Sequence, residues 1–178
     1  MYHWWMFPDI YGQDEIKDIN KFLKKNFIDD GIDRAAEGVL KTSAVGVVQW
    51  GDISNTMAKI EHCMLYANRV NFAYDTHLPL DMLQLFNHNT YCEGEEYGWH
   101  QDKISDPNRI NDIKLTFIIN LSEQSYIGGD LYITKKEKME LGPGSAIVFT
   151  GGLYHKVTPV VDGTRISLTT WIEGPRWR

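Results

Sequence analysis

The second half of the chain alternates between short runs of β-branched and aromatic residues and clusters of Gly, Pro, Asn and Asp, and this pattern restricts the fold more than any other feature. Runs of this kind predict strands, and the clusters between them predict turns. The predicted strands cover residues 82–87, 113–121, 130–134, 145–150, 156–160 and 165–172. Turns are expected at Gly128-Gly129, Gly142-Pro143-Gly144 and Asp162-Gly163. Many short strands separated by turns are typical of a β-sandwich or a jelly roll.

The first 80 residues predict helices as well as strands. Apolar side chains recur every three or four positions in residues 13–27, which predicts an amphipathic helix with one face made by Ile16, Ile19, Leu23 and Phe27. A β-rich run covers residues 44–50, and Ser54 or Asn55 is expected to cap a second helix. The buried face of that helix would consist of Met57, Ile60, Met64 and Ala67. We therefore expect a mainly β fold with N-terminal helices, of the α+β class, in which the helices cover one outer face of a jelly-roll core.

Length and composition limit the classes of protein to which the chain can belong. A chain of 178 residues fits one domain, with helical support and outer strands in residues 1–80 and the jelly-roll core in residues 81–178. Aromatic residues make up 12% of the chain, which excludes disorder as the main state, and the net charge of -6 disfavours a nucleic-acid-binding protein with a basic face.

The same sequence contains no signal for export or for a membrane. Cys63 and Cys92 are too few for a disulfide framework, which favours a reducing compartment. Residues 1–11 are aromatic but lack the basic and apolar regions of a signal peptide. No run approaches the roughly 20 apolar residues of a membrane span. We expect a cytoplasmic protein that binds neither membranes nor nucleic acid.

His100 and Asp102 form an HxD motif that could bind a metal ion. If the motif lies on a strand, both side chains point to the same face and can reach one ion. His155, which follows the apolar run 146–149, adds a second imidazole. Two histidines and one carboxylate form a facial triad that leaves open positions on the metal and suits ferrous iron that activates oxygen. The other interpretation is that these are turn, loop or surface residues without a ligand.

Arg165 and Ser167 form an RxS motif ten residues after His155. An oxygenase with this triad needs a two-electron donor. A 2-keto acid could be that donor and chelate the metal. Its far carboxylate would then need a fixed partner in the protein. Arginine can hold a carboxylate through two parallel hydrogen bonds, and a serine on the same strand face can add a third. Taken alone, Arg165 could equally be an exposed strand arginine.

The order HxD, His and RxS resembles that of the iron(II)/2-oxoglutarate dioxygenases, and most closely that of their prolyl 4-hydroxylase-like branch, with the PKHD-type hydroxylases of bacteria and phages. The similarity covers most of the chain from about Ala67 onward. The matching segments are Leu83-Gln84, Tyr91, residues 97–102 (YGWHQD), Leu121-Ser122, residues 126–131 (YIGGDL), Gly142, His155, Val157, Pro159-Val160, residues 163–168 (GTRISL) and Trp171.

The resemblance implies a double-stranded β-helix, which is this jelly roll, with the iron at one mouth of the barrel. His100, Asp102 and His155 take the places of the metal ligands, and Arg165 with Ser167 takes the place that binds the distal carboxylate of 2-oxoglutarate. Other residues implied near the cosubstrate are Tyr91 and Asn120, the latter at a strand position where animal-type prolyl hydroxylases carry a tyrosine. The implied cofactors are Fe(II), 2-oxoglutarate and O2, with L-ascorbate as the reductant.

The resemblance is compatible with more than one class of substrate. The resemblance suggests hydroxylation of a prolyl residue in a peptide or protein, with release of succinate and CO2, by a monomer or homodimer. Residues expected in the substrate pocket are Tyr97, Trp99, Arg109 and Trp171. The alternatives are a small-molecule substrate, a superfamily member acting on a free amino acid or a nucleobase, and a cupin-like or lectin-like jelly roll that binds a metal or sugar without oxygen chemistry.

Overall fold

Two antiparallel sheets form the body of the protein. The computed structural model describes residues 2–30, 38–103, 108 and 110–177. The larger sheet runs in the order β1-β10-β6-β13-β4-β3-β2. Its strands are β1 (Trp4–Phe7), β10 (Ala146–Thr150), β6 (Asn111–Asn120), β13 (Arg165–Pro175), β4 (Leu85–Tyr91), β3 (Ala44–Gln49) and β2 (Asp29–Asp30).

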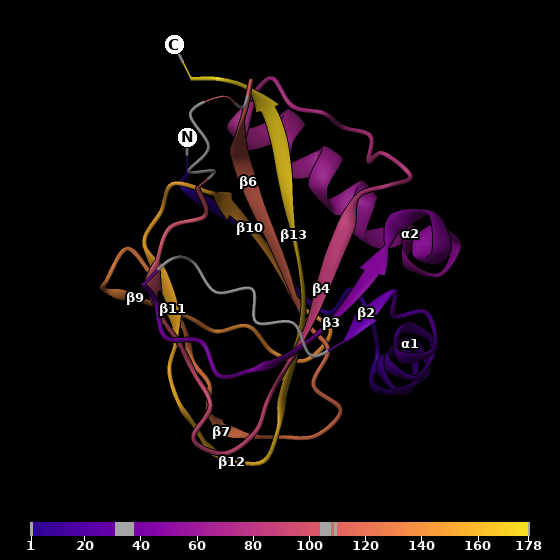
Figure 1. Cartoon of the computed structure of the whole chain (residues 1–178), viewed down its shortest axis with the longest axis vertical. Coiled ribbons are helices and arrows are strands. Elements are labelled where there is room, and N and C mark those ends of the chain that lie inside the picture. Colours follow the sequence, from indigo (N-terminus) through magenta and orange to yellow (C-terminus); the bar gives the residue numbers. More distant parts are fainter. Residues whose placement is uncertain (1, 31–37, 104–107, 109, 178) are drawn as a thin grey trace.

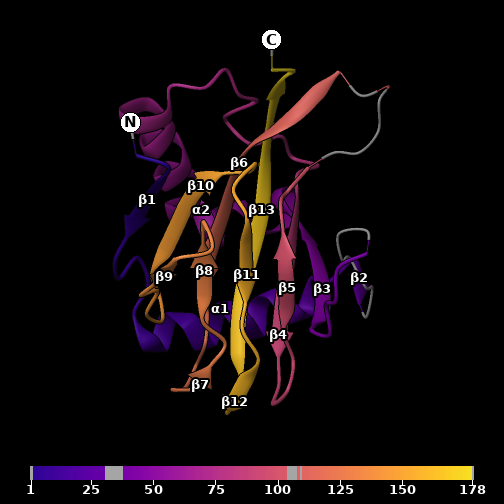
Figure 2. The same cartoon turned by 90° about the vertical axis from the view of Figure 1, so that its left-hand side faces the viewer.

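The smaller sheet lies across from the larger one and has the order β5-β11-β8-β9. Its strands are β5 (Tyr97–His100), β11 (His155–Val157), β8 (Leu131–Ile133) and β9 (Glu137–Met139). Figure 2 shows these strands side by side in front of the larger sheet. A short pair, β7 (Ile127–Gly128) with β12 (Val160–Asp162), continues them at one end. The arrangement confirms the predicted mainly β fold with a jelly-roll core.

The helices cover only the outer face of the larger sheet (Figure 1). They are α1 (Gln13–Lys25), α2 (Trp50–Ala67) and the short π-helix η1 (Asn68–Phe72). The apolar residues predicted for α1 and α2 are buried there, except that Phe27 is partly buried and follows the end of α1. This burial leaves the other face of the sheet to line the barrel, where a second apolar cluster includes Ile118, Phe149 and Val157.

Some local predictions were wrong and some strands were missed, because tertiary packing or backbone chemistry outweighed the local pattern. Helix α2 begins at Trp50 with Gln49 as its N-cap, not at Ser54 or Asn55, because the Trp50 ring is buried in a stack on Phe86 with 5.6 Å between ring centres. The predicted strand 156–160 is two strands, since Pro159 has no N–H to continue the ladder. The N-terminal strand β1 was not predicted at all; it pairs with β10 at the edge of the sheet.

None of the helices in the described residues is long and apolar enough to cross a membrane. Cys63 and Cys92 are free thiols. The assignment of all 178 residues to one domain stays a prediction.

His88 gives the fold a pH-dependent stability. This β4 residue is 1% exposed, and its Nε2 lies 3.0 Å from Oδ1 of Asn20 in α1. Burial, and then the charge of Lys24, lower the pKa of His88 from 6.5 to about 4. The unfolded chain therefore binds a proton at His88 near pH 6.5, whereas the folded chain does so only near pH 4. The contribution of neutral His88 to the free energy of unfolding is therefore fully present above pH 6.5, and it is lost as the pH falls toward 4.

We expect the free energy of unfolding to drop by up to about 3 kcal/mol across this range because of His88. The measurement is urea unfolding at several pH values, for the parent and for His88→Gln. The variant should show a flatter profile, while other titrating groups contribute equally to both proteins and cancel. Parallel profiles for the two proteins would mean that His88 is not the group responsible.

Candidate metal centre

The three predicted metal ligands lie together inside the barrel. Their ligand atoms are all within 4.8 Å of one another. His100 ends β5 and His155 begins β11, and the two residues are cross-strand partners. Nε2 of His100 is 3.6 Å from Oδ1 of Asp102, and Nε2 of His155 is 3.4 Å from Oδ2. All three side chains are at most 8% exposed, so water screens this cluster poorly.

The donor set of this cluster fits a divalent cation. Nδ1 of His100 is 2.8 Å from the carbonyl of Gly98, and Nδ1 of His155 is 2.9 Å from that of Leu153. A carbonyl only accepts, so each Nδ1 carries the hydrogen and a neutral ring has a lone pair on Nε2. Burial, followed by the imidazole of His155, lowers the pKa of His100 to about 4, which keeps that ring neutral. The Nε2 lone pairs point at the Asp102 carboxylate, and the two repel each other. A cation between the imidazoles and the carboxylate is attracted by both.

Backbone hydrogen bonds set the position of Asp102. The residue lies just beyond the end of β5, so the two HxD residues do not share a strand. The N–H of Asp102 instead donates to the carbonyl of Gly151 at 2.9 Å, in the loop that leads to His155. The side-chain amide of Gln101 donates to the carbonyl of Gly152. The two ligand-bearing segments are thus tied together by the protein itself.

Thr116 on β6 orients the Asp102 carboxylate. Its hydroxyl donates to Oδ2 of Asp102 at 2.6 Å, and Thr116 is fully buried. Hydrogen bonds to metal ligands of this kind typically contribute about ten- to a hundredfold to metal affinity. Thr116→Val should therefore weaken Co(II) binding by roughly that factor in calorimetric titration, and Thr116→Ser should restore it.

The matched control for Thr116 is Thr170→Val. Thr170 is equally buried, but its hydroxyl donates to the carbonyl of Leu85 at 2.8 Å, away from the ligands. That variant should lose stability and bind Co(II) as the parent does. Equal affinity in Thr116→Val and the parent would show that the hydrogen bond does not contribute to the site.

Arg165 is a buried cation in the same pocket as the three ligands. It is 2% exposed, and among the described residues it forms no ion pair with an Asp or Glu. One guanidinium nitrogen donates to Oγ of Ser167 at 2.9 Å, and the guanidinium carbon lies 5.2 Å from the ring centre of Tyr91. Gly129 lets the side chain pass, because a Cβ there would be 3.0 Å from Cδ of Arg165. A buried arginine without a carboxylate partner is suited to an anionic ligand.

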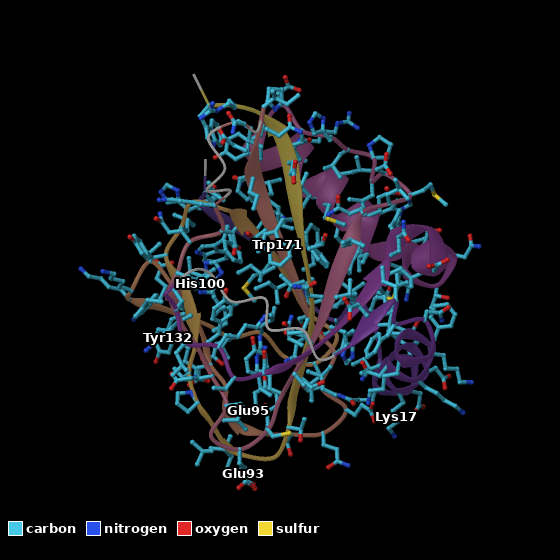
Figure 3. All side chains as sticks on the ribbon, viewed as in Figure 1. Lys17, Glu93, Glu95, His100, Tyr132 and Trp171 are labelled. Atoms are coloured by element: carbon cyan, nitrogen blue, oxygen red, sulfur yellow. The ribbon has the colours of Figure 1, made fainter. Side chains whose placement is uncertain are left out.

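Tyr97 and Trp171 form aromatic walls of this pocket. The Tyr97 ring stacks on the imidazole of His100 with 3.7 Å between ring centres. Trp171 on β13 is the cross-strand partner of Thr116, which places it beside the metal ligands. Figure 3 shows Trp171 in the space between the two sheets, with His100 toward the smaller sheet. Tyr91 and Ser167 line the pocket as well.

Two other predicted site residues are absent from the lining of this pocket. Asn120 is the cross-strand partner of Ser167 and lines a neighbouring groove of about 670 Å³, which Arg165 lines as well. Its amide donates to Tyr126 Oη at 3.1 Å and to the Leu141 carbonyl at 2.7 Å. Both amide hydrogens are therefore engaged within the protein. Trp99 is absent from the pocket lining; its ring lies 5.1 Å from Nζ of Lys156. Arg109 lies outside the described residues.

Lys41 lines the pocket although no motif in the sequence predicts it. Its Nζ donates to Oδ1 of Asn89 at 3.1 Å and lies 4.9 Å from the ring centre of Tyr97. Backbone hydrogen bonds join Leu40 to Gly98 in β5 and Thr42 to Glu96 just before it, and this pairing brings Lys41 to the site. A single lysine before a β-rich run carries no local signal for such a contact.

Comparisons with known proteins agree with this geometry. The family model of the 2OG-Fe(II) oxygenase superfamily matches residues 86–173, which include all three candidate ligands and Arg165. A PKHD-type hydroxylase of Alteromonas mediterranea is 36% identical over 94 residues, which cover 48% of this chain and 41% of the relative. This match therefore spans less than half the length of that relative. A PKHD-type hydroxylase of Stenotrophomonas maltophilia is 27% identical over 93% of this chain and 76% of its own length.

Solved structures share the fold. A Pseudomonas putida prolyl-4-hydroxylase has a TM-score of 0.71 and 20% identity, with 99% of this chain and 95% of that one covered. A viral collagen prolyl hydroxylase from Paramecium bursaria Chlorella virus-1 also has a TM-score of 0.71, at 19% identity and 97% coverage of both chains. The family match, the relatives and the fold all support a 2OG-Fe(II) oxygenase that is prolyl hydroxylase-like.

Proposed function

We propose that the chain hydroxylates a C–H bond of a prolyl residue in a peptide or protein, consuming O2 and 2-oxoglutarate and releasing succinate and CO2. The observation that carries the proposal is one pocket lined by a buried His-Asp-His cluster and a buried arginine without a carboxylate partner among the described residues. A metal- or sugar-binding jelly roll has no need of that arginine. The names of the relatives, PKHD-type hydroxylase and prolyl-4-hydroxylase, support the prolyl substrate.

Separate groups of residues would bind the metal and the cosubstrate. His100, Asp102 and His155 would hold Fe(II), which when bound supplies the oxygen chemistry with 2-oxoglutarate as the electron donor. Arg165 and Ser167 would bind the distal carboxylate of 2-oxoglutarate through charge-assisted hydrogen bonds. Burial raises the pKa of Tyr91, which keeps its hydroxyl protonated beside that carboxylate.

The remaining walls would position the substrate. Tyr97 and Trp171 present apolar ring surface next to the ligands, which suits a pyrrolidine ring. Their bulk excludes water from the pocket, and low polarity strengthens the charge interactions within it. Ascorbate would keep the iron reduced between turnovers.

Turnover with defined peptides tests the proposal. The protein is incubated with Fe(II), 2-oxoglutarate and ascorbate, with and without a panel of proline-containing peptides and with free proline. Succinate is quantified, and each candidate is examined by mass spectrometry for a gain of one oxygen. We expect peptide-dependent succinate release that matches the oxygen incorporated. The absence of succinate under all conditions, or full activity with Zn(II) in place of iron, would contradict an oxygenase.

A further inference from the structure

The barrel face of the larger sheet contains polar atoms that form no hydrogen bond within the fold. Among the described residues, both amide atoms of Asn87 and the indole Nε1 of Trp171 are buried without a hydrogen-bond partner. Asn87 is 1% exposed. Buried amide groups are almost always paired, because leaving one unpaired costs its full desolvation energy. An asparagine with both ends unpaired therefore needs an explanation outside the fold.

Asn87 lies on the face of β4 that lines the barrel. Phe86 and His88 point to the helices, where Phe86 joins the apolar core and His88 contacts α1. Side chains alternate along a strand, so Asn87 shares the opposite face with Asn89, which lines the pocket. Its cross-strand partner on β13 is Thr169, another residue of the pocket lining.

Trp171 continues this face of β13 toward the metal ligands. It lies two residues beyond Thr169, and its cross-strand partner Thr116 holds Asp102. Thr169 thus adjoins Asn87 across the strands and Trp171 along β13. Thr169 and Trp171 line the pocket, and Asn87 lies next to them on the barrel face of the sheet. Figure 3 shows Trp171 facing the space between the sheets.

These atoms form a specific hydrogen-bonding pattern. The Asn87 amide offers a donor and an acceptor, and the indole of Trp171 offers a donor only. A prolyl residue within a peptide has a carbonyl on each side and an N–H only on the residue that follows. Two donors and one acceptor are the complement of these three groups. A free amino acid would instead present a carboxylate and an ammonium group.

Resting on the proposed function, we propose that Asn87, together with the indole of Trp171, binds the main-chain amides that flank the substrate residue. The substrate class is then an internal residue of a peptide rather than a free amino acid. Because these polar atoms stabilise nothing in the fold, an apolar side chain at position 87 should leave stability unchanged or raise it while substrate binding is lost.

Two probes that differ in one group test the pairing with Asn87. N-acetyl-proline N-methylamide has the N–H that follows the proline, and N-acetyl-proline methyl ester has an oxygen in its place. Binding is followed by the change each probe causes in the visible charge-transfer band of the Fe(II)–2-oxoglutarate complex. The parent should bind the amide roughly five- to tenfold more tightly than the ester. Asn87→Leu should bind both weakly and without preference.

Tyr11→Phe is the matched control. The Tyr11 hydroxyl is also buried without a partner, but it lies in the core under the helices. Its removal should leave stability unchanged or raise it and leave the preference for the amide intact. The inference would be overturned if Asn87→Leu still preferred the amide probe. It would also be overturned if Asn87→Leu lost stability but bound both probes as the parent does, or if the Fe(II)–2-oxoglutarate complex of the parent responded to neither probe. Failure of the parent to form the Fe(II)–2-oxoglutarate complex would count against the proposed function instead.

Discussion

Asp102→Ala is expected to abolish turnover and to weaken Fe(II) or Co(II) binding by more than the roughly hundredfold that loss of an outer hydrogen bond costs. Asp102 is the only anion among the three candidate ligands, and both Nε2 atoms lie within 3.6 Å of its oxygens. Its removal takes away one ligand and the charge that neutralises the cation. Anaerobic calorimetric titration with Fe(II) measures the affinity directly.

Asp162→Ala is the control for this experiment, because Asp162 is an exposed aspartate on β12 away from the pocket. It should bind metal and turn over as the parent does. Unfolding curves of both variants distinguish loss of the site from loss of the fold. Parental metal affinity in a folded Asp102→Ala protein would show that the metal lies elsewhere.

Arg165→Met is expected to raise the apparent dissociation constant for 2-oxoglutarate by roughly ten- to a hundredfold while metal binding is retained. The prediction follows from the loss of a charge-assisted pair, which contributes on the order of 1.5–3 kcal/mol. Methionine keeps the unbranched stem that passes Gly129, so the variant isolates the guanidinium from the packing. Titration of 2-oxoglutarate against the Fe(II) complex gives the constant.

Two further variants separate charge from geometry. Arg165→Lys should lie between the parent and Arg165→Met, because lysine keeps the charge but not the planar fork. Arg176→Ala removes an exposed arginine near the C-terminus and should change nothing. If Arg165→Met binds 2-oxoglutarate as tightly as the parent, the distal carboxylate has another partner.

The fold could be predicted where local pattern and tertiary burial agree. The period of apolar residues in α1 and the Gly-rich turns around residues 128–129 and 144 are local signals, and all three glycines have positive φ. The start of α2 and the strand β1 could not be predicted, because they depend on Phe86 and on β10, which are distant in the sequence.

The candidate site divides in the same way. The HxD, His and RxS residues were recognisable because their spacing along the chain carries the information, and the structure brings them into one pocket. Lys41, Asn87 and Thr116 carry no such spacing. Pairing with a neighbouring strand places Lys41 in the pocket lining and places Asn87 and Thr116 beside lining residues. Lys, Asn and Thr are common on strands for other reasons, so the residue type alone does not indicate a site.

The hydrogen bond from the N–H of Asp102 to the carbonyl of Gly151 has a consequence for the order of assembly. Both imidazoles also donate through Nδ1 to backbone carbonyls, so hydrogen bonds within the protein fix the positions of all three ligands. We therefore expect Fe(II) to bind after the chain has folded, and one divalent ion to exchange for another without unfolding. Metal identity would accordingly follow from supply and relative affinity after synthesis is complete.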